Sequence, residues 1–238
     1  MNHPSSGLLL GLCGRNASGK STICEYVQQR LGWSTCSLSD AIREHLMETG
    51  EKPPYTRACL IEAGNTLRRR DGPGALAVAT LSRLDEIRAS PSSSLPSCST
   101  ISDAIVCESP RKLPEWMIGR GCVAIDSIRH PAEVEALRKG PCPFLLLHVT
   151  APAKLRYAWL LSRNRAGDVK TEEEFVAAEE LELRHPDKDG QQLLDVFAEA
   201  DLQLENTAAS REAFFEYLDV FFRSAVQSRV QQQPDPCS

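Results

Sequence analysis

Residues 14–21 read Gly-Arg-Asn-Ala-Ser-Gly-Lys-Ser and fit the pattern G-x-x-x-x-G-K-[ST] at every fixed position. The apolar residues 8–12 come before this segment as a buried strand would, and residues 21–31 follow it with the pattern of a helix. Glycine at both ends of such a loop lets backbone N–H groups turn toward an anion, and the positive end of the helix adds to the attraction. The segment therefore predicts a phosphate-binding P-loop.

The residues of this loop have separate predicted roles. Lys20 is expected to reach the β- and γ-phosphates of ATP, and Ser21 is expected to ligate Mg²⁺. The residues predicted to hold the nucleotide are Gly14, Ser18, Gly19, Lys20, Ser21 and Thr22. A Gly/Ser-rich turn before an ordinary helix would show some of the same residues, but the strand–loop–helix context favours nucleotide binding.

Composition limits the kind of protein that this chain can be. Its 238 residues are enough for one α/β domain, and a net charge of −5 gives no basic excess of the kind that nucleic acid attracts. The nine cysteines include no Cys-x-x-Cys pair, so they indicate small buried side chains in a reducing compartment. The sequence has neither the pattern of a signal peptide nor a run of about 18 apolar residues. We therefore expect a cytoplasmic protein with no membrane or nucleic-acid partner; the oligomeric state stays open.

Apolar segments and helical periodicity alternate along the chain. The predicted strands are residues 8–12, 34–38, 123–126, 144–149 and 202–204. The predicted helices are residues 21–31, 41–48, 56–69, 75–88, 131–138, 152–164, 172–184, 190–200 and 209–229. Because strands that alternate with helices favour a parallel sheet covered on both faces, the expected fold is α/β: a three-layer P-loop fold with a five-stranded parallel sheet and a helical lid.

This organisation predicts a single P-loop domain over residues 1–230, with the lid at about 163–185. Residues 90–102 are rich in Ser and Pro, and we expect them to form an insertion too polar to pack. Residues 231–238 are expected to be a flexible tail.

Polar residues follow the second predicted strand. Ser39 or Asp40 could simply cap the next helix. Loops at the carboxyl ends of parallel strands, however, form the ligand crevice of such sheets. Arg43, one turn further on, would then direct its guanidinium at a second, phosphate-bearing ligand.

The third predicted strand ends in Asp126, which is the form of a Walker B segment. Its carboxylate could hold Mg²⁺ directly or through water. Arg129 leaves the same strand end and is a further candidate for the acceptor. Glu133 and Arg138 on the next helix are expected to form a salt-bridge pattern on the surface.

Arginines also follow the helix after the fourth strand. Arg163 and Arg165 stand just before Gly167, so a hinged lid could bring them to the negative charge that develops in phosphoryl transfer. The alternative is a basic helix end that only interacts with the helix dipole.

The order of these motifs resembles the nucleoside-monophosphate kinase and dephospho-coenzyme A kinase group of P-loop proteins, over roughly residues 7 to 222. Ser39-Asp40-x-x-Arg43 is similar to the Gly-Asp-x-x-Arg element of adenylate kinases, and Asp126-Ser-Ile-Arg129 to their Asp-Gly-Phe-Pro-Arg turn. The Asp-Ala-Asp element of bacterial dephospho-coenzyme A kinases is missing. Residues 127–135 also resemble a segment of the P-loop domain fused to some deoxycytidylate deaminases.

The resemblance implies a phosphotransferase that uses ATP and Mg²⁺ on a small phosphorylated acceptor, with a (deoxy)nucleoside monophosphate as the first candidate. Dephospho-coenzyme A is an alternative, and its hydroxyl group would need a carboxylate such as that of Asp40 as a general base. A domain that senses nucleotide without transferring phosphate is another. The residues implied as catalytic are Lys20, Arg163, Arg165 and Asp126. Those implied for the acceptor are Asp40, Arg43 and Arg129, and those for the metal are Ser21 and Asp126.

Overall fold

The computed structural model describes residues 7–89, 121–163 and 170–232. Its centre is a five-stranded, all-parallel sheet with the strand order β2-β3-β1-β4-β5. The strands are β1 Leu9–Cys13, β2 Ser34–Ser37, β3 Val123–Asp126, β4 Phe144–Thr150 and β5 Leu202–Glu205. The predicted five-stranded α/β fold is thus confirmed, with strand ends within one residue of those expected. The predicted insertion at residues 90–102 and Arg165 lie outside the described residues, as do residues 233–238 of the predicted tail.

Alternation along β1 divides the core into two layers. Leu10 and Leu12 belong to the cluster on one face of the sheet, whereas Leu9 and Cys13 belong to the cluster on the other. This is the period of two that an extended strand imposes on its side chains. Because both faces are covered, every residue of β1 is buried, which explains its continuous apolar sequence.

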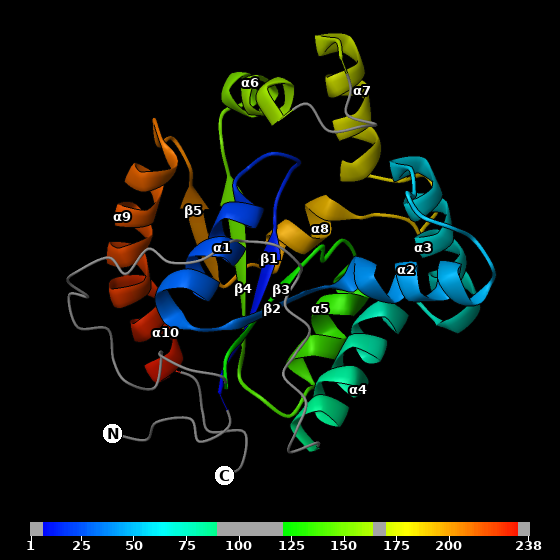
Figure 1. The fold of residues 1–238 in the computed structure, drawn as a ribbon, viewed down its shortest axis with the longest axis horizontal. Helices are drawn as coiled ribbons and strands as arrows, with labels where there is room; N and C mark the ends of the chain where they lie inside the picture. The colour runs from blue at the N-terminus through cyan, green and yellow to red at the C-terminus, as the bar shows by residue number, and fades with distance from the viewer. Residues whose placement is uncertain (1–6, 90–120, 164–169, 233–238) are drawn as a thin grey trace.

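Helices cover the two faces (Figure 1). On one side lie α1 Lys20–Leu31, α9 Arg211–Phe221 and α10 Gln227–Gln232. On the other lie α2 Leu38–Glu48, α3 Arg57–Asp71, α4 Ala75–Ala89, α5 Pro131–Arg138 and α8 Leu193–Ala198. The helix predicted over residues 209–229 is interrupted by a π-helical turn, η2 Phe222–Val226, and the helix predicted over 190–200 is shorter than expected.

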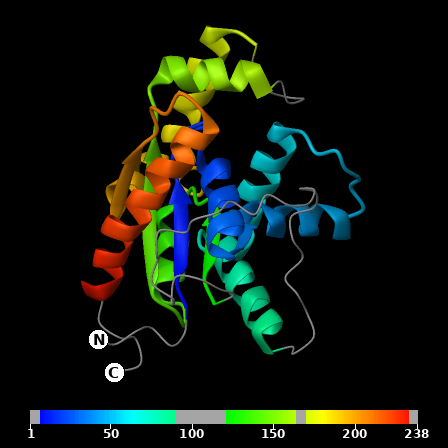
Figure 2. The same ribbon diagram turned by 60° about the vertical axis from the view of Figure 1, so that its left-hand side comes forward.

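Two further helices stand above the carboxyl ends of the strands, α6 Ala153–Arg163 and α7 Glu172–Leu183. Figure 2 shows α6 lying across this end of the sheet. α7 begins with a capping box in which Thr171 and Glu174 exchange hydrogen bonds with each other's backbone N–H groups, so its first residue is set by local sequence. These helices form the upper boundary of the candidate site.

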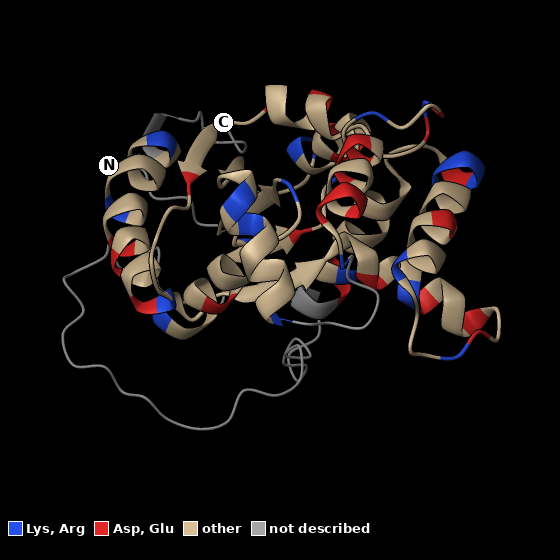
Figure 3. Cartoon of the chain, turned by 90° about the horizontal axis from the view of Figure 1, so that it is seen from above, with Lys and Arg blue, Asp and Glu red and all other residues tan. Residues whose placement is uncertain are grey.

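Charged residues of both signs are interspersed on the helices seen from this end (Figure 3). Within the described ranges, no helix is long and apolar enough to span a bilayer.

Candidate active site

A cavity of about 720 Å³ opens at the carboxyl edge of the sheet. The P-loop, the start of α1 and the loop after β5 line one part of it. The first turns of α2 and α3 and the loop after β3 line another. A ligand that fills this cavity would therefore contact the predicted P-loop together with Arg43 and Arg129, two of the three predicted acceptor residues.

The backbone of the P-loop requires its two terminal glycines. Gly14 has φ +144°, and a Cβ atom there would lie 2.2 Å from the carbonyl oxygen of Val149. Gly19 has φ +106°, and its Cβ would lie 2.5 Å from Nδ2 of Asn206. The amide of Asn206 is buried and donates to the carbonyl oxygen of Ser18 at 3.2 Å. The loop is thus held against the backbone of β4 and the side chain of Asn206, which directly follows β5, and only glycine allows so close an approach.

Lys20 is the first residue of α1 and lies back over the loop. Its Nζ donates to the carbonyl oxygens of Gly14 at 2.9 Å and Arg15 at 2.8 Å. Burial lowers the pKa of the ammonium, and the nearby carboxylate of Asp126 acts in the opposite direction. The arrangement keeps the ammonium group beside the backbone that would surround a phosphate.

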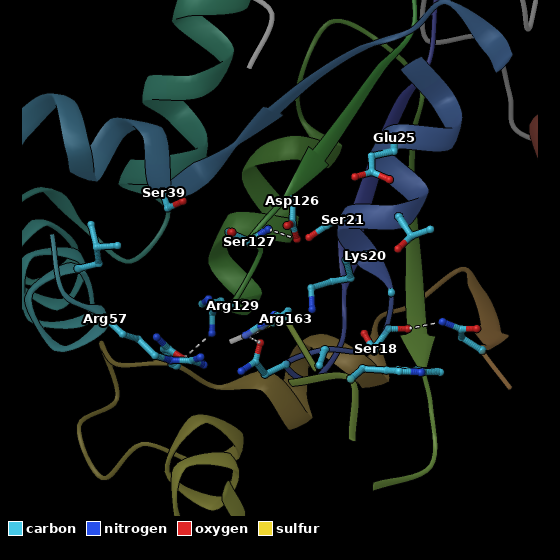
Figure 4. A pocket seen from close by; sticks show the side chains of 18 of the residues that line it. Ser18, Lys20, Ser21, Glu25, Ser39, Arg57, Asp126, Ser127, Arg129 and Arg163 are labelled. Carbon is cyan, nitrogen blue, oxygen red and sulfur yellow. Dashed lines mark hydrogen bonds between the residues drawn. The ribbon is translucent and has the colours of Figure 1, made fainter. Parts of the chain in front are cut away.

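Two oxygen ligands for a hard cation face this part of the cavity. Asp126 ends β3 and Ser21 is in the first turn of α1, and Figure 4 shows their side chains side by side. The Oδ1 atom of Asp126 also accepts from the backbone N–H of Ser127 at 2.6 Å, which fixes the carboxylate. A hydroxyl and a carboxylate suit Mg²⁺, which takes its remaining ligands from phosphate and water. This donor set fits the predicted metal.

Arg43 and Asp40 lie together at the start of α2. Nη1 of Arg43 donates to Oγ of Ser39 at 2.8 Å and to Oδ1 of Asp40 at 3.0 Å, and both Ser39 and Arg43 line the cavity. The other carboxylate oxygen of Asp40 accepts from the backbone N–H of Ser37 in a capping box. The N-cap of α2 is thus Ser37 rather than Ser39 or Asp40, and α2 begins three residues earlier than predicted. Asp40 lies within the first turn as the acidic partner of the capping box, and its role toward an acceptor stays a prediction.

Arg129 follows β3 and faces the cavity beside Arg57 of α3 (Figure 4). Nη1 of Arg129 donates to Oε2 of Glu182 at 3.2 Å and to Oε1 of Gln191 at 3.0 Å. Arg57 pairs with the other oxygen of Glu182. A buried acid on α7 therefore contacts two cavity-lining arginines that are far apart in the sequence.

The surface salt bridge predicted for Glu133 and Arg138 is wrong. Glu133 is fully buried, and its Oε1 accepts from Nε and Nη2 of Arg68 at 3.0 and 2.8 Å. Its Oε2 accepts from the backbone N–H groups of Arg129 and His130, which caps α5. Arg138 pairs instead with Asp201. The sequence did contain a signal, because Glu133 stands three residues after the N-cap His130, which is the position of the acidic partner in a capping box.

Only part of the predicted lid lies within the described residues. Arg163 ends α6, and its Nη2 donates to Oδ1 of Asn16 in the P-loop at 3.2 Å. On α7, the buried Glu179 pairs with Arg156 of α6 and with Arg15 of the P-loop, the latter at 3.2 Å. These contacts place both helices against the P-loop.

No protein-family model matches the chain. A UPF0200 protein of Pyrococcus furiosus is 30% identical over 178 residues, which cover 74% of this chain and 78% of that relative. The chain belongs to the UPF0200 family. A second UPF0200 protein, from Halobacterium salinarum strain R1, is 27% identical over 200 residues and 84% of each chain.

Among solved structures, this UPF0200 chain is similar to TT1252 of Thermus thermophilus, with a TM-score of 0.50 and 16% identity over 97% of this chain and 100% of the other. At that identity the likeness shows the fold alone. A shikimate kinase of Acinetobacter baumannii aligns with a TM-score of 0.40 and 11% identity over 97% of this chain and 96% of the other, which carries no argument about substrate. The likeness to TT1252 agrees with the α/β fold described above.

Sequence reasoning missed the acids that hold the arginines. Glu179 and Glu182 lie three residues apart on one face of α7, but this helix also has exposed glutamates on its other faces. Acidic composition alone does not tell which side chains are buried. A weak signal was available in Phe175, because it precedes Glu179 by four residues and marks the buried side of the helix.

Proposed function

We propose that this UPF0200 protein transfers the γ-phosphoryl group of ATP to a small phosphorylated acceptor, with a nucleoside monophosphate as the first candidate. The observation that carries the proposal is the shared cavity. One cavity is lined by the P-loop and by Arg43, Arg57 and Arg129, which come from separate elements. Such a site can hold two phosphate-bearing molecules, each against its own set of donors.

The residues have complementary proposed roles. Lys20 stabilises charge on the β- and γ-phosphates, and backbone N–H groups of the P-loop orient them. Ser21 and Asp126 hold Mg²⁺, which when bound neutralises phosphate charge. Arg43 and Arg129 orient the acceptor phosphate, and the lid arginines Arg163 and Arg165 neutralise the group in transfer.

The contacts of Asp40 favour a phosphate acceptor over a hydroxyl acceptor. A phosphate oxygen is already anionic near neutral pH, so no strong general base is needed. A hydroxyl, as in dephospho-coenzyme A, would need a carboxylate that is free to accept its proton. The carboxylate of Asp40 is instead engaged by the backbone of Ser37 and by Arg43.

The test is a panel assay. The protein is incubated with ATP·Mg²⁺ and, one at a time, with the ribo- and deoxyribonucleoside monophosphates and dephospho-coenzyme A, while ADP is measured. We expect acceptor-dependent ADP with at least one monophosphate and little with dephospho-coenzyme A. The Lys20→Ala variant is the negative control, because it lacks the charge at the transferring phosphate.

Two outcomes would contradict the proposal. Tight ATP binding without ADP from any acceptor would indicate a nucleotide-sensing domain. ADP formation that is equal with and without acceptor would indicate simple hydrolysis. If the protein is a kinase, Arg163→Ala should also lower kcat more than it raises the KM for ATP. A lid contact that forms in the transition state acts mainly on kcat.

A further inference from the structure

One buried carboxylate joins two arginines of the cavity that have no relation in the sequence. Glu182 of α7 is 7% exposed. Its Oε1 pairs with Nη2 of Arg57, at the start of α3, and its Oε2 pairs with Nη1 of Arg129, after β3. The two guanidinium groups therefore contact different oxygens of the same carboxylate. This shared partner keeps them close together.

Each arginine retains donors for a ligand. Among contacts between described residues, Arg57 uses only Nη2, and Arg129 uses only Nη1, which it shares between Glu182 and Gln191. Both side chains line the cavity, and they are 36% and 29% exposed. Since a guanidinium has five N–H donors in a planar fork, each arginine can hold Glu182 and an anion together.

The charges support the same arrangement. Two arginines this close together would repel each other without an anion between them, and the charge of Lys20 adds to the repulsion on Arg129. Burial by itself would raise the pKa of Glu182, but Arg129 and Arg57 hold it below its ordinary value, so the carboxylate is ionised at neutral pH. It offsets one of the two positive charges and leaves a net charge of +1 facing the cavity.

We propose that Glu182 is a positioning residue, which orients Arg57 and Arg129 so that both bind the same anionic group of the acceptor. This inference rests on the proposed function, and it adds Arg57 to the acceptor contacts. α7 is then more than a cover for the nucleotides, because it also fixes the arginines on the far side of the cavity.

The experiment measures anion binding without turnover. The P-loop is filled with Mg²⁺ and the non-hydrolysable analogue AMP-PNP, and inorganic phosphate is titrated by calorimetry. Glu182→Gln should weaken phosphate binding about tenfold or more, because the amide cannot accept from both arginines. AMP-PNP affinity should change by less than about threefold. Glu180→Gln, an exposed neighbour on the same helix, is the matched control and should change neither.

Arg57→Ala guards against a variant that fails to fold, because it leaves Glu182 paired with Arg129. Arg57→Ala should also weaken phosphate binding about tenfold. Combined with Glu182→Gln it should cost less than the sum of the two single losses, since both changes affect the Arg57 contact and only the release of Arg129 is added. Fully additive losses would mean that Arg57 and Glu182 act independently and would overturn the inference.

Other results separate this inference from the proposed function. Unchanged or tighter phosphate binding to Glu182→Gln would overturn the positioning role, and tighter binding would make Glu182 a competitor of the anion. Absence of phosphate binding to the unmodified protein would also overturn it. If Glu182→Gln weakens phosphate but no acceptor yields ADP, the anion site stands and the kinase proposal fails. If acceptors yield ADP and Glu182→Gln leaves their KM unchanged, only the positioning role fails.

Discussion

The P-loop and the arginine-rich part of the cavity are built from different kinds of contact. In the P-loop, consecutive residues supply backbone N–H groups, and glycine geometry fixes their direction. In the arginine-rich part, side chains from α2, α3 and the loop after β3 supply the donors, and acids on α5 and α7 hold them. A backbone site is specified over eight neighbouring residues, whereas a side-chain site depends on ion pairs that span the whole fold. The two should therefore respond differently to substitution.

The largest expected effect is on stability, in the arginine-rich part. Glu133→Ala leaves Arg68 buried without its partner, and removing one member of a buried pair costs about 3–5 kcal/mol. Urea unfolding of the variant should show this loss. Glu135→Ala is the control on the same helix, because Glu135 pairs with Lys139 at the surface. A loss for Glu133→Ala of under about 1 kcal/mol would show that this pair behaves like a surface pair.

The P-loop should show the opposite pattern, with a large effect on catalysis and a small one on stability. Lys20→Ala should lower turnover by about 10²-fold or more, because it removes a preorganised charge at the transferring phosphate. Its contacts are to backbone oxygens of its own loop, so the folded state should survive. Steady-state ADP formation and thermal unfolding measure the two effects. Near-normal turnover in folded Lys20→Ala protein would contradict P-loop phosphoryl transfer.

The two arginines proposed to bind the acceptor allow a finer comparison. Arg129→Ala and Arg43→Ala should each weaken acceptor binding by roughly 1.5–3 kcal/mol, and ATP binding much less. Arg129 should have the larger effect, since it is the less exposed and is held by Glu182 and Gln191. Separate titrations of acceptor and ATP into each variant would check this. Equal weakening of both ligands would mean that the acceptor site lies elsewhere.

This difference between the two regions also explains what could be predicted from sequence. The P-loop, the five strands and most of the helix starts follow from local patterns, such as glycine spacing, apolar alternation and capping residues. The starts predicted for α2 and α8 each differ by three residues from those observed. Arg43 and Arg129 could be placed at the cavity because loops at the carboxyl ends of parallel strands converge there. The functional roles assigned to these residues are still predictions.

The ion pairs could not be predicted, because they depend on long-range packing. Arg68, Arg69 and Arg70 are consecutive, yet their side chains are 3%, 47% and 57% exposed. The packing of α3 against α2 and α4, which turns Arg68 toward Glu133 of α5, decides which one is buried. The burial of Glu182 likewise depends on how α7 lies over the cavity, and composition gives no sign of it.

Low pH should weaken the ion pairs that Glu182 makes in the arginine-rich part. Because the pKa of Glu182 lies below its ordinary value of 4.5, its ion pairs contribute stability fully above that pH. The contribution is lost as the pH falls through the lower value of the folded protein. The difference in melting temperature between the unmodified protein and Glu182→Gln should therefore be largest at neutral pH and shrink below about pH 4.5. A difference that stays constant over this range would mean that Glu182 contributes through packing rather than charge.

The smallest expected effect concerns Arg69, the neighbour of the buried Arg68. Arg69 is half-exposed and pairs with Glu62 and Asp187 at 3.2 and 3.5 Å. Exposed pairs of this kind contribute about 0.2–1 kcal/mol, since water and salt screen them. Arg69→Ala should fall in that range and lose its effect in high salt, whereas Arg68→Ala should be several times more destabilising and keep its effect. Both are measured by urea unfolding at low and high ionic strength. Similar losses in the free energy of unfolding for the two variants would mean that burial does not decide how much each arginine contributes to stability.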